Sequence, residues 1–373
     1  MIEASAWVSR SPKIIRDPLS ARRSHHSLAR LFLNIYLLAI ITLWSVPFVH
    51  AQSPEAAESG QGQGQKKEKE KFPLGLSTKF LLVVGAAGTP EYRSQFEHDA
   101  QQWTRLAHDR QMELVSIDSA NESSEPKQRE LLQSAIVDAD KENVAQLWIV
   151  LIGHGTSERG THKFNLVGPD VSSKELAGWL KDLTCSVIVI NCSSASAPFL
   201  PELSSSDRIV VTATRSGSEN NYSRFGTQLA NCILDPATDI DHDEEVSLLE
   251  AFLAAAANTE KFYREQNRLA TEHALIDDNG DKLGTGAEFF RGTRAVKAAQ
   301  AGKQLDGLQA ARLILHSAES APKLSEALQT RRAEIEDEIN RHRLSKSSPP
   351  TDAYWDELER LLLELASVYA QAQ

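Results

Sequence analysis

The sequence lacks the features that mark a membrane-spanning or a nucleic-acid-binding protein. Its apolar run Leu31–Val46 has about sixteen residues and is interrupted by Asn34, whereas a spanning helix prefers about twenty. The net charge is −11, and no basic stripe with interleaved aromatic residues is present. We therefore expect no nucleic-acid partner.

Several kinds of reaction centre are also missing. There is no Gly-x-Ser-x-Gly elbow that would support a serine nucleophile. The histidines have no ligand spacing with the cysteines, which argues against zinc. The segment Gly85–Gly88 follows an apolar stretch but lacks the spacing of a dinucleotide-binding loop.

The N-terminal segment has the pattern of an export signal. Basic residues precede the apolar run Leu31–Val46, and Val49–Ala51 supplies a small-residue cleavage pattern. We expect residues 1–51 to be a signal peptide and the protein to be exported by the secretory route, to the periplasm or the extracellular space. A signal retained as a membrane anchor is the alternative. Residues 52–76, rich in Gly, Gln, Lys and Glu, are predicted to be a disordered linker.

Cysteine is scarce, and its number is odd. The chain has three cysteines, so at least one stays unpaired or pairs between chains. If Cys192 is free, Cys185 and Cys232 could form a disulfide in an oxidising compartment. Both positions also suit buried thiols, which is the alternative.

Two reactive side chains follow apolar runs of the kind that form central strands of a parallel sheet. Ile149–Ile152 is followed by His154, and Val187–Ile190 is followed by Cys192. A helix predicted over 172–180 lies between them and gives a right-handed strand–helix–strand crossover. Sites in such sheets lie beyond the carboxyl ends of the strands, so we expect the two side chains to be neighbours.

The pair has the chemistry of a nucleophile and its base. A cysteine attacks as thiolate, and His154 could take the Cys192 proton and later return it to a leaving amine. The backbone N–H groups of Gly155 and Cys192 could stabilise the oxyanion. Taken singly, Cys192 is more simply interpreted as a buried thiol and His154 as a loop histidine.

These motifs resemble the legumain-like cysteine peptidases of the caspase clan over about residues 77 to 285. In that family one strand ends in His-Gly, and a later strand ends in Cys followed by a Ser-Gly-Ser stretch. The matching segments here are Phe80–Gly88 with Tyr92 and Arg93, His154–Gly155, Cys192–Ser196 and Ile209–Ser216. The resemblance implies a caspase-like fold and a peptidase that needs no metal.

The resemblance also implies roles for four other residues. Arg93 would lie in the pocket for the side chain before the scissile bond, with Ser193 and Ser216 as further substrate-binding residues. A retained arginine suits a carboxylate or an amide, so specificity for Asn or Asp is the expectation. Glu91 stands where the family has the asparagine that orients the catalytic histidine.

An acidic segment downstream has the spacing of a calcium-binding loop. Positions 1, 3, 5, 9 and 12 of a twelve-residue pattern are Asp239, Asp241, Asp243, Ser247 and Glu250. A second segment repeats the spacing with Asp277, Asn279, Asp281, Thr285 and Glu288. Neither has the usual glycine at position 6, so solvated acidic turns are the alternative to a structural calcium site.

The region 291–373 is rich in Ala, Glu, Arg and Leu, with helical periodicity over 324–344 and 354–369. Leu358, Leu361, Leu362 and Leu365 form one apolar stripe, which must pack against something. We expect an antiparallel helical hairpin, packed on itself or on the preceding domain. An arm that mediates association with a partner is the alternative.

Together these patterns predict an α/β peptidase domain over 77–290, with a mostly parallel sheet flanked by helices and a C-terminal α-helical extension. The expected function is an exported cysteine endopeptidase acting on protein or peptide substrates. A transpeptidase using the same acyl-enzyme and a catalytically inactive binding module of the same fold are the alternatives.

Overall fold

The computed structural model describes residues 77–118, 127–297, 299–300, 303–318, 321–345 and 350–371. The predicted signal peptide, 1–51, and linker, 52–76, lie outside this set. No helix within the described residues is long and apolar enough to cross a membrane.

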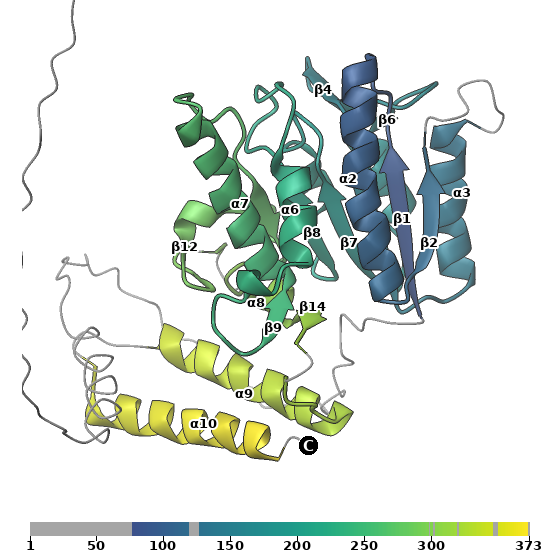
Figure 1. Cartoon of the computed structure of the whole chain (residues 1–373). Coiled ribbons are helices and arrows are strands. Elements are labelled where there is room, and N and C mark those ends of the chain that lie inside the picture. Colours follow the sequence, from purple (N-terminus) through teal and green to yellow (C-terminus); the bar gives the residue numbers. More distant parts are fainter. Residues whose placement is uncertain are drawn as a thin grey trace, which may run out of the picture. The chain divides into compact units, whose positions relative to one another are not determined.

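A seven-stranded sheet forms the centre of the domain, in the order β11-β10-β8-β7-β3-β1-β2 (Figure 1). The five strands from β2 to β8 are parallel, and β10 and β11 add an antiparallel edge. The strands are β1 (Thr78–Val84), β2 (Glu113–Ile117), β3 (Gln146–Ile152), β7 (Ser186–Asn191), β8 (Arg208–Thr212), β10 (Leu275–Asp277) and β11 (Thr285–Gly286).

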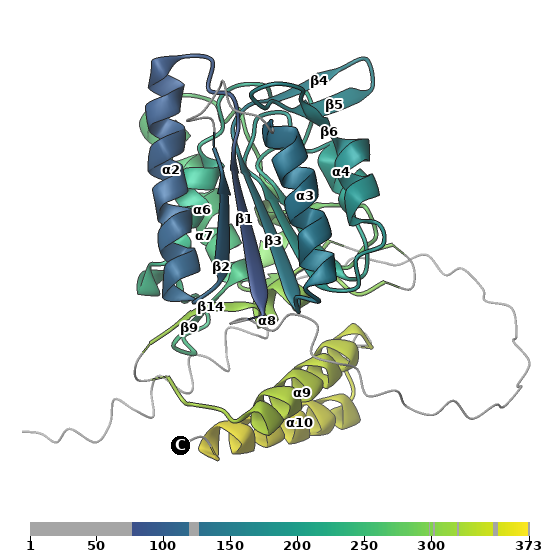
Figure 2. The same ribbon diagram turned by 90° about the vertical axis from the view of Figure 1, so that its right-hand side faces the viewer.

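Helices cover both faces of the sheet, because successive strand residues point to opposite sides and both sides are apolar (Figure 2). Phe80 and Leu82 of β1 pack in one core with α2, α6, α7 and α8, and Leu81 and Val83 pack in a second core with α3, α4 and α5. The helices are α2 (Pro90–Asp109), α3 (Gln128–Lys141), α4 (Ser173–Leu180), α5 (Phe199–Leu203), α6 (Phe225–Ile233), α7 (Leu248–Glu265) and α8 (Leu308–Arg312). The predicted α/β class is confirmed.

Local capping explains where the helices begin. Thr89 caps α2, and Pro90 occupies its first turn, where a missing N–H costs nothing. Ser172 and Glu175 form the capping box of α4, the helix predicted between the two reactive residues.

Three small sheets of short strands lie outside the seven-stranded sheet, within the described residues. A three-stranded sheet, β4 (Gly155–Glu158), β5 (Thr161–Phe164) and β6 (Val171–Ser172), follows directly after His154 and was not expected from the sequence. Two further pairs are β9 (Glu245–Ser247) with β14 (Ile314–Ser317), and β12 (Phe290–Arg291) with β13 (Arg294–Ala295). Single 3₁₀ turns span η1 (Pro236–Thr238) and η2 (Ala287–Phe289).

The α/β domain extends beyond the expected boundary at residue 290. Strand β14 pairs with β9, and Ala310, Leu313 and Leu315 are buried in the same core as α6 and α7. The helical extension therefore starts with α9 (Glu326–Leu344), which is followed by α10 (Asp352–Ala370).

The expected hairpin of α9 and α10 is present and packs on itself. Ile335 and Ile339 of α9 bury against Leu361 and Val368 of α10, whereas Leu362 stays 44% exposed. The hairpin contacts the α/β domain through ion pairs of Arg332 with Glu245, 2.8 Å, and of Arg312 with Asp337.

Cys185 and Cys232, for which a disulfide and free thiols were both open, form no disulfide, because all three cysteines are free. Cys185 lies beside β7 on the α4 side of the sheet, and Cys232 lies in α6 on the other side. The sheet separates the two thiols.

Candidate functional site

The candidate site lies where two neighbouring parallel strands end. Strands β3 and β7 are hydrogen-bonded partners, with Leu151 opposite Asn191. His154 follows β3 by two residues, and Cys192 follows β7 directly. The strand–helix–strand crossover thus brings the two segments side by side at the carboxyl edge of the sheet, as expected.

Aromatic rings of α2 hold the His154 imidazole. Tyr92 and Phe96 contact the imidazole edge-on, with ring centroids at 4.7 Å and 5.2 Å. Tyr222 packs on both of these rings. Burial lowers the pKa of His154 below its usual value, and a hydrogen bond with the Ala87 backbone acts in the opposite direction. The imidazole is therefore neutral near pH 7, the form in which it can accept a proton.

The prediction that Glu91 orients His154 does not fit this arrangement. Glu91 is exposed in the first turn of α2, and its carboxylate accepts hydrogen bonds from its own backbone N–H and from Thr89. The hydrogen bond to the imidazole comes instead from the Ala87 backbone, in the loop before α2. The sequence could not predict this partner, because a backbone group can come from any type of residue.

Cys192 is buried beneath the start of α6. Its side chain lies against Gly226, where an added β-carbon would stand 2.9 Å from the Cys192 Sγ. The residue is only 6% exposed. Burial raises the pKa of the thiol well above its usual value, and the nearby charges of Asp99 and Glu272 add to this. In this conformation Cys192 is a protonated thiol.

Both amides proposed as oxyanion donors already have partners. The Cys192 N–H donates to the Leu151 carbonyl, 2.9 Å, as a continuation of the sheet. The Gly155 N–H donates to Ser194 Oγ, 3.2 Å. The prediction for Cys192 is therefore wrong in this conformation, because the sheet occupies its N–H, and Gly155 would have to exchange its partner.

A tightly packed serine-rich loop follows the cysteine. Asn191 Oδ1 accepts hydrogen bonds from the backbone N–H of Ser193, 3.1 Å, and from its hydroxyl, 2.6 Å. Ala195 adopts a left-handed φ of 50°, and its N–H donates to the Glu219 carbonyl, 2.7 Å. Ser193 is fully buried, so its predicted contact with substrate is wrong for this conformation. Asn191 thus shapes the loop after Cys192.

The other two predicted substrate-binding residues are accessible. Arg93 is half-buried in the first turn of α2, next to Tyr92, whose ring contacts His154. Ser216 is half-buried beyond β8, and its hydroxyl lies 2.7 Å from that of Ser218. Their role in reading a substrate stays a prediction.

Two buried carboxylates near Cys192 escaped the sequence analysis. Asp99 of α2 is 4% exposed and accepts hydrogen bonds from Thr227, 2.7 Å, and from Tyr222. Glu272 is also 4% exposed and lies just before β10. The helical spacing of Tyr92, Phe96 and Asp99 could have placed Asp99 on the inner face of α2, but nothing local points to Glu272.

The first acidic loop brings Asp239, Asp241 and Asp243 together, with one carboxylate oxygen of each within 4.8 Å of the others. Glu244 at position 6 makes the sharp turn without glycine, at a left-handed φ of 69°. Burial and the neighbouring Asp241 raise the pKa of Asp243 to about 7.

Glu250, the expected ligand at position 12 of the first loop, is already engaged. Its carboxylate accepts from the N–H groups of Ile240 and Ser247 and from the Ser247 hydroxyl, as part of the capping box of α7. Its prediction as a metal ligand is wrong for this conformation.

The second acidic loop forms a different cluster from the one that its spacing predicts. Asp277 and Asp281 come together with Asp306, which lies outside the twelve-residue pattern, and all three are buried. Glu288 at position 12 is exposed instead. Burial raises the pKa of Asp306 to about 8.

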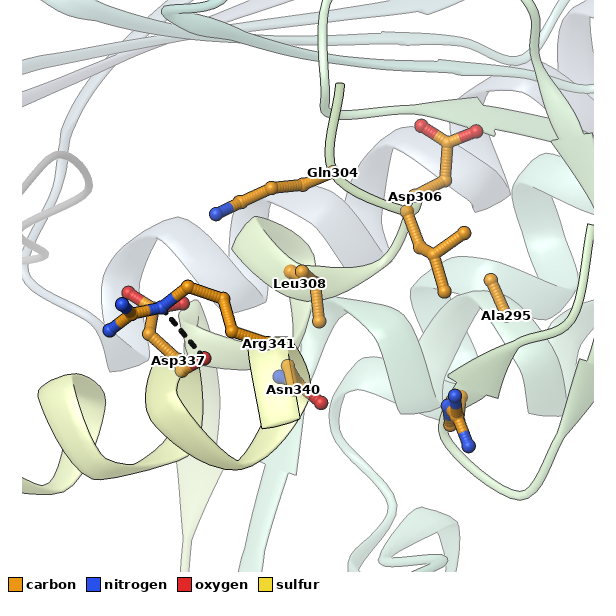
Figure 3. Close-up of a pocket in the computed structure, with 9 residues that line it drawn as sticks. Ala295, Gln304, Asp306, Leu308, Asp337, Asn340 and Arg341 are labelled. Carbon is orange, nitrogen blue, oxygen red and sulfur yellow. Dashed lines mark hydrogen bonds between the residues drawn. The ribbon is translucent and has the colours of Figure 1, made fainter. Parts of the chain in front are cut away.

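A small pocket lies away from the candidate site, between α9 and the segment that precedes α8 (Figure 3). Its lining residues are Arg294, Ala295, Gln304, Leu305, Asp306, Leu308, Asp337, Asn340 and Arg341. It contains neither His154 nor Cys192, so it is separate from the candidate nucleophile and base.

Comparisons with known proteins leave the assignment at the level of the fold. No family model matches the chain, and no curated protein matches it. Among solved structures, the Drosophila initiator caspase Dronc matches with a TM-score of 0.40 and 15% identity, over 63% of this chain and 94% of that chain. A likeness this distant says nothing about reacting groups. The legumain-like assignment therefore stays a prediction.

Proposed function

We propose that this chain is an exported cysteine endopeptidase in which Cys192 is the nucleophile and His154 the general base and acid. One observation carries the proposal. His154 and Cys192 follow β3 and β7, which are adjacent hydrogen-bonded strands, at the edge of a parallel sheet where sites are usually found.

The protonation states support a reaction that starts from a neutral pair. Burial favours a neutral His154 and a protonated Cys192. His154 would take the thiol proton as the sulfur attacks the scissile carbonyl, and would return it to the leaving amine as the carbon–nitrogen bond breaks. Water would then release the acyl group from Cys192 by the same steps. An amine in place of water would make the enzyme a transpeptidase.

The substrate proposal rests on Arg93, which lies beside the aromatic cluster that holds His154. A guanidinium donates paired hydrogen bonds to a carboxylate and can also bind an amide oxygen. We therefore propose Asp or Asn before the scissile bond, with Ser216 as a second contact.

The second candidate is a binding module that retains the fold without catalysis. The observation that favours it is the closed state of the site. Cys192 is buried, and the N–H groups of Cys192 and Gly155 already have partners. An active enzyme would have to move the loop after Cys192.

The test is turnover of fluorogenic peptides with Asn, Asp, Arg or Lys before the leaving group. We expect turnover of Asp or Asn peptides that is lost in both Cys192→Ala and His154→Ala, whereas Cys185→Ala, a cysteine on the other side of the sheet, keeps it. Turnover that survives in Cys192→Ala would refute the dyad. No turnover by any peptide would favour the binding module.

The proposed reaction requires no cofactor, and we retain calcium as a proposed structural ion. Three carboxylates per cluster are suitable ligands for a hard cation. Calcium should raise the melting temperature relative to EDTA. Loss of this shift in Asp243→Asn would place the ion at the first loop, and loss in Asp306→Asn at the second. An equal melting temperature with and without calcium would reject both.

A further inference from the structure

The start of α6 lies directly against the candidate nucleophile. Gly226, in the first turn of this nine-residue helix, packs directly on the Cys192 side chain. The amino end of a helix carries unpaired N–H groups and a partial positive charge, and such an end normally favours a thiolate. Cys192 is nevertheless a protonated thiol in this structure.

A buried carboxylate already occupies that helix end. Glu272 accepts hydrogen bonds from the backbone N–H groups of Arg224, 2.8 Å, and Phe225, 3.0 Å. The Ser223 hydroxyl, 2.6 Å, and the Tyr263 hydroxyl, 2.9 Å, donate to the same carboxylate. Glu272 therefore engages two of the N–H groups at the start of α6, those of Arg224 and Phe225.

We propose that Glu272 is a positioning residue that keeps the Cys192 thiol protonated, because its charge occupies the amino end of α6 in place of the thiolate. It acts through the helix end and does not touch the reacting atoms. The consequence for catalysis rests on the proposed function, since it matters only if Cys192 is the nucleophile. The effect on thiol reactivity does not depend on turnover.

Three other ionisable groups lie around the Cys192 thiol or at the start of α6 and could also affect its protonation. Asp99 faces Cys192 from α2, is 4% exposed, and adds negative charge in the same sense as Glu272. His154 follows the adjacent strand β3. Arg224, at the start of α6, stacks on Phe262 at 4.2 Å. Glu272 differs from these three groups because its carboxylate accepts from the N–H groups at the helix start.

The test compares Glu272→Gln with Glu272→Asp in the full chain. Glutamine keeps an oxygen that can accept from Ser223 and Phe225, while its amide group can face the Tyr263 hydroxyl, so the variant removes the charge with little change of shape. Aspartate keeps the charge and shortens the side chain. Alkylation by iodoacetamide between pH 6 and pH 10, followed for each cysteine by peptide mass spectrometry, reports the reactivity of Cys192 directly.

We expect Glu272→Gln to raise the rate of Cys192 alkylation at pH 8 about tenfold relative to Cys185 and Cys232, which corresponds to about one pKa unit. Glu272→Asp should leave that relative rate near the wild-type value. Cys185 and Cys232 serve as internal standards and should keep their rates. Glu250→Gln, which removes a carboxylate from the capping box of α7 instead, should not change Cys192.

Two results would overturn the proposal. One is a folded Glu272→Gln protein whose Cys192 alkylation rate is unchanged. The other is an equal rise in the rates of all three cysteines, which would mean that the variant only loosens the core. If Glu272→Gln does not fold, Glu272→Ala replaces it as the charge-removing variant, and an unchanged Cys192 rate relative to Cys185 and Cys232 there would also refute the proposal. Peptide turnover, measured separately, tests the proposed function.

Discussion

At the scale of single residues, the absence of a side chain at Gly226 makes room for the candidate nucleophile. A β-carbon at that position would lie 2.6 Å from the Cys192 β-carbon, which is closer than real contacts allow. Both residues are buried, so neither can move into solvent. The position therefore couples the packing of α6 to the placement of the thiol.

We predict that Gly226→Ala destabilises the protein by about 1–3 kcal/mol, because the core must shift to admit one methyl group. Gly178→Ala in α4 is the matched control, since an added β-carbon there meets nothing within 4 Å. That variant should gain about 0.5–1 kcal/mol from helix propensity. Urea unfolding measures both. A neutral Gly226→Ala would show that α6 is not held against Cys192.

At the scale of helices, the C-terminal hairpin is built as a small core of its own. Ile335, Ile339, Leu361 and Val368 bury one another, while the outer side of α10 keeps Leu363 64% exposed. Of the apolar stripe predicted from the sequence, Leu358, Leu361 and Leu365 belong to this inner row, whereas Leu362 lies with Leu363 in an exposed outer row.

We predict that Leu361→Ala weakens this hairpin by about 2–5 kcal/mol, the usual cost of a buried leucine. Hydrogen exchange should then become faster across both α9 and α10 together. Leu363→Ala, two residues along the same helix, should change stability by no more than about 0.5 kcal/mol. Equal effects of the two substitutions would contradict the division into an inner and an outer row.

The sequence predicts some elements of the site well and others not at all. The runs before His154 and Cys192 are apolar on both sides, which identifies central parallel strands and so fixes the edge of the sheet where both residues lie. The groups that tune these residues come from elsewhere in the chain. Glu272 lies eighty positions after Cys192, and only the packing of α6 and β10 brings it near, so no local pattern predicts it.

The calcium-loop spacing also predicts local groupings of residues well and the effects of helix capping and tertiary folding poorly. It correctly groups Asp239, Asp241 and Asp243, which share one turn of chain. It fails at Glu250, because helix capping competes for that carboxylate. It also misses Asp306, which tertiary folding adds to the second cluster.

At the scale of the whole molecule, buried carboxylates make stability depend on pH. Burial raises the pKa of Asp306 to about 8 and that of Asp278 to about 6, against about 3.9 for an unfolded aspartate. Between pH 4 and pH 8 these two carboxyl groups thus bind more protons in the folded protein than in the unfolded chain. Their contribution to the free energy of unfolding falls as pH rises through this window.

We predict that, in EDTA, the urea midpoint decreases steadily from pH 5 to pH 8. Asp306→Asn should flatten this decrease, because it removes a carboxyl group whose pKa burial raises to about 8. Asp182→Asn, at an exposed position, should leave the pH dependence as it is. A slope that is the same in Asp306→Asn and in the wild-type protein would show that Asp306 is ionised throughout.

The hairpin of α9 and α10 lies at the amino edge of the parallel strands, where β1 also begins (Figures 1 and 2). His154 and Cys192 follow the carboxyl ends of β3 and β7, at the opposite edge of the sheet. Both ends of the described chain therefore leave the domain on the side away from the candidate site. If the protein were attached through either end, the carboxyl edge of the sheet, with His154 and Cys192, would face away from the point of attachment.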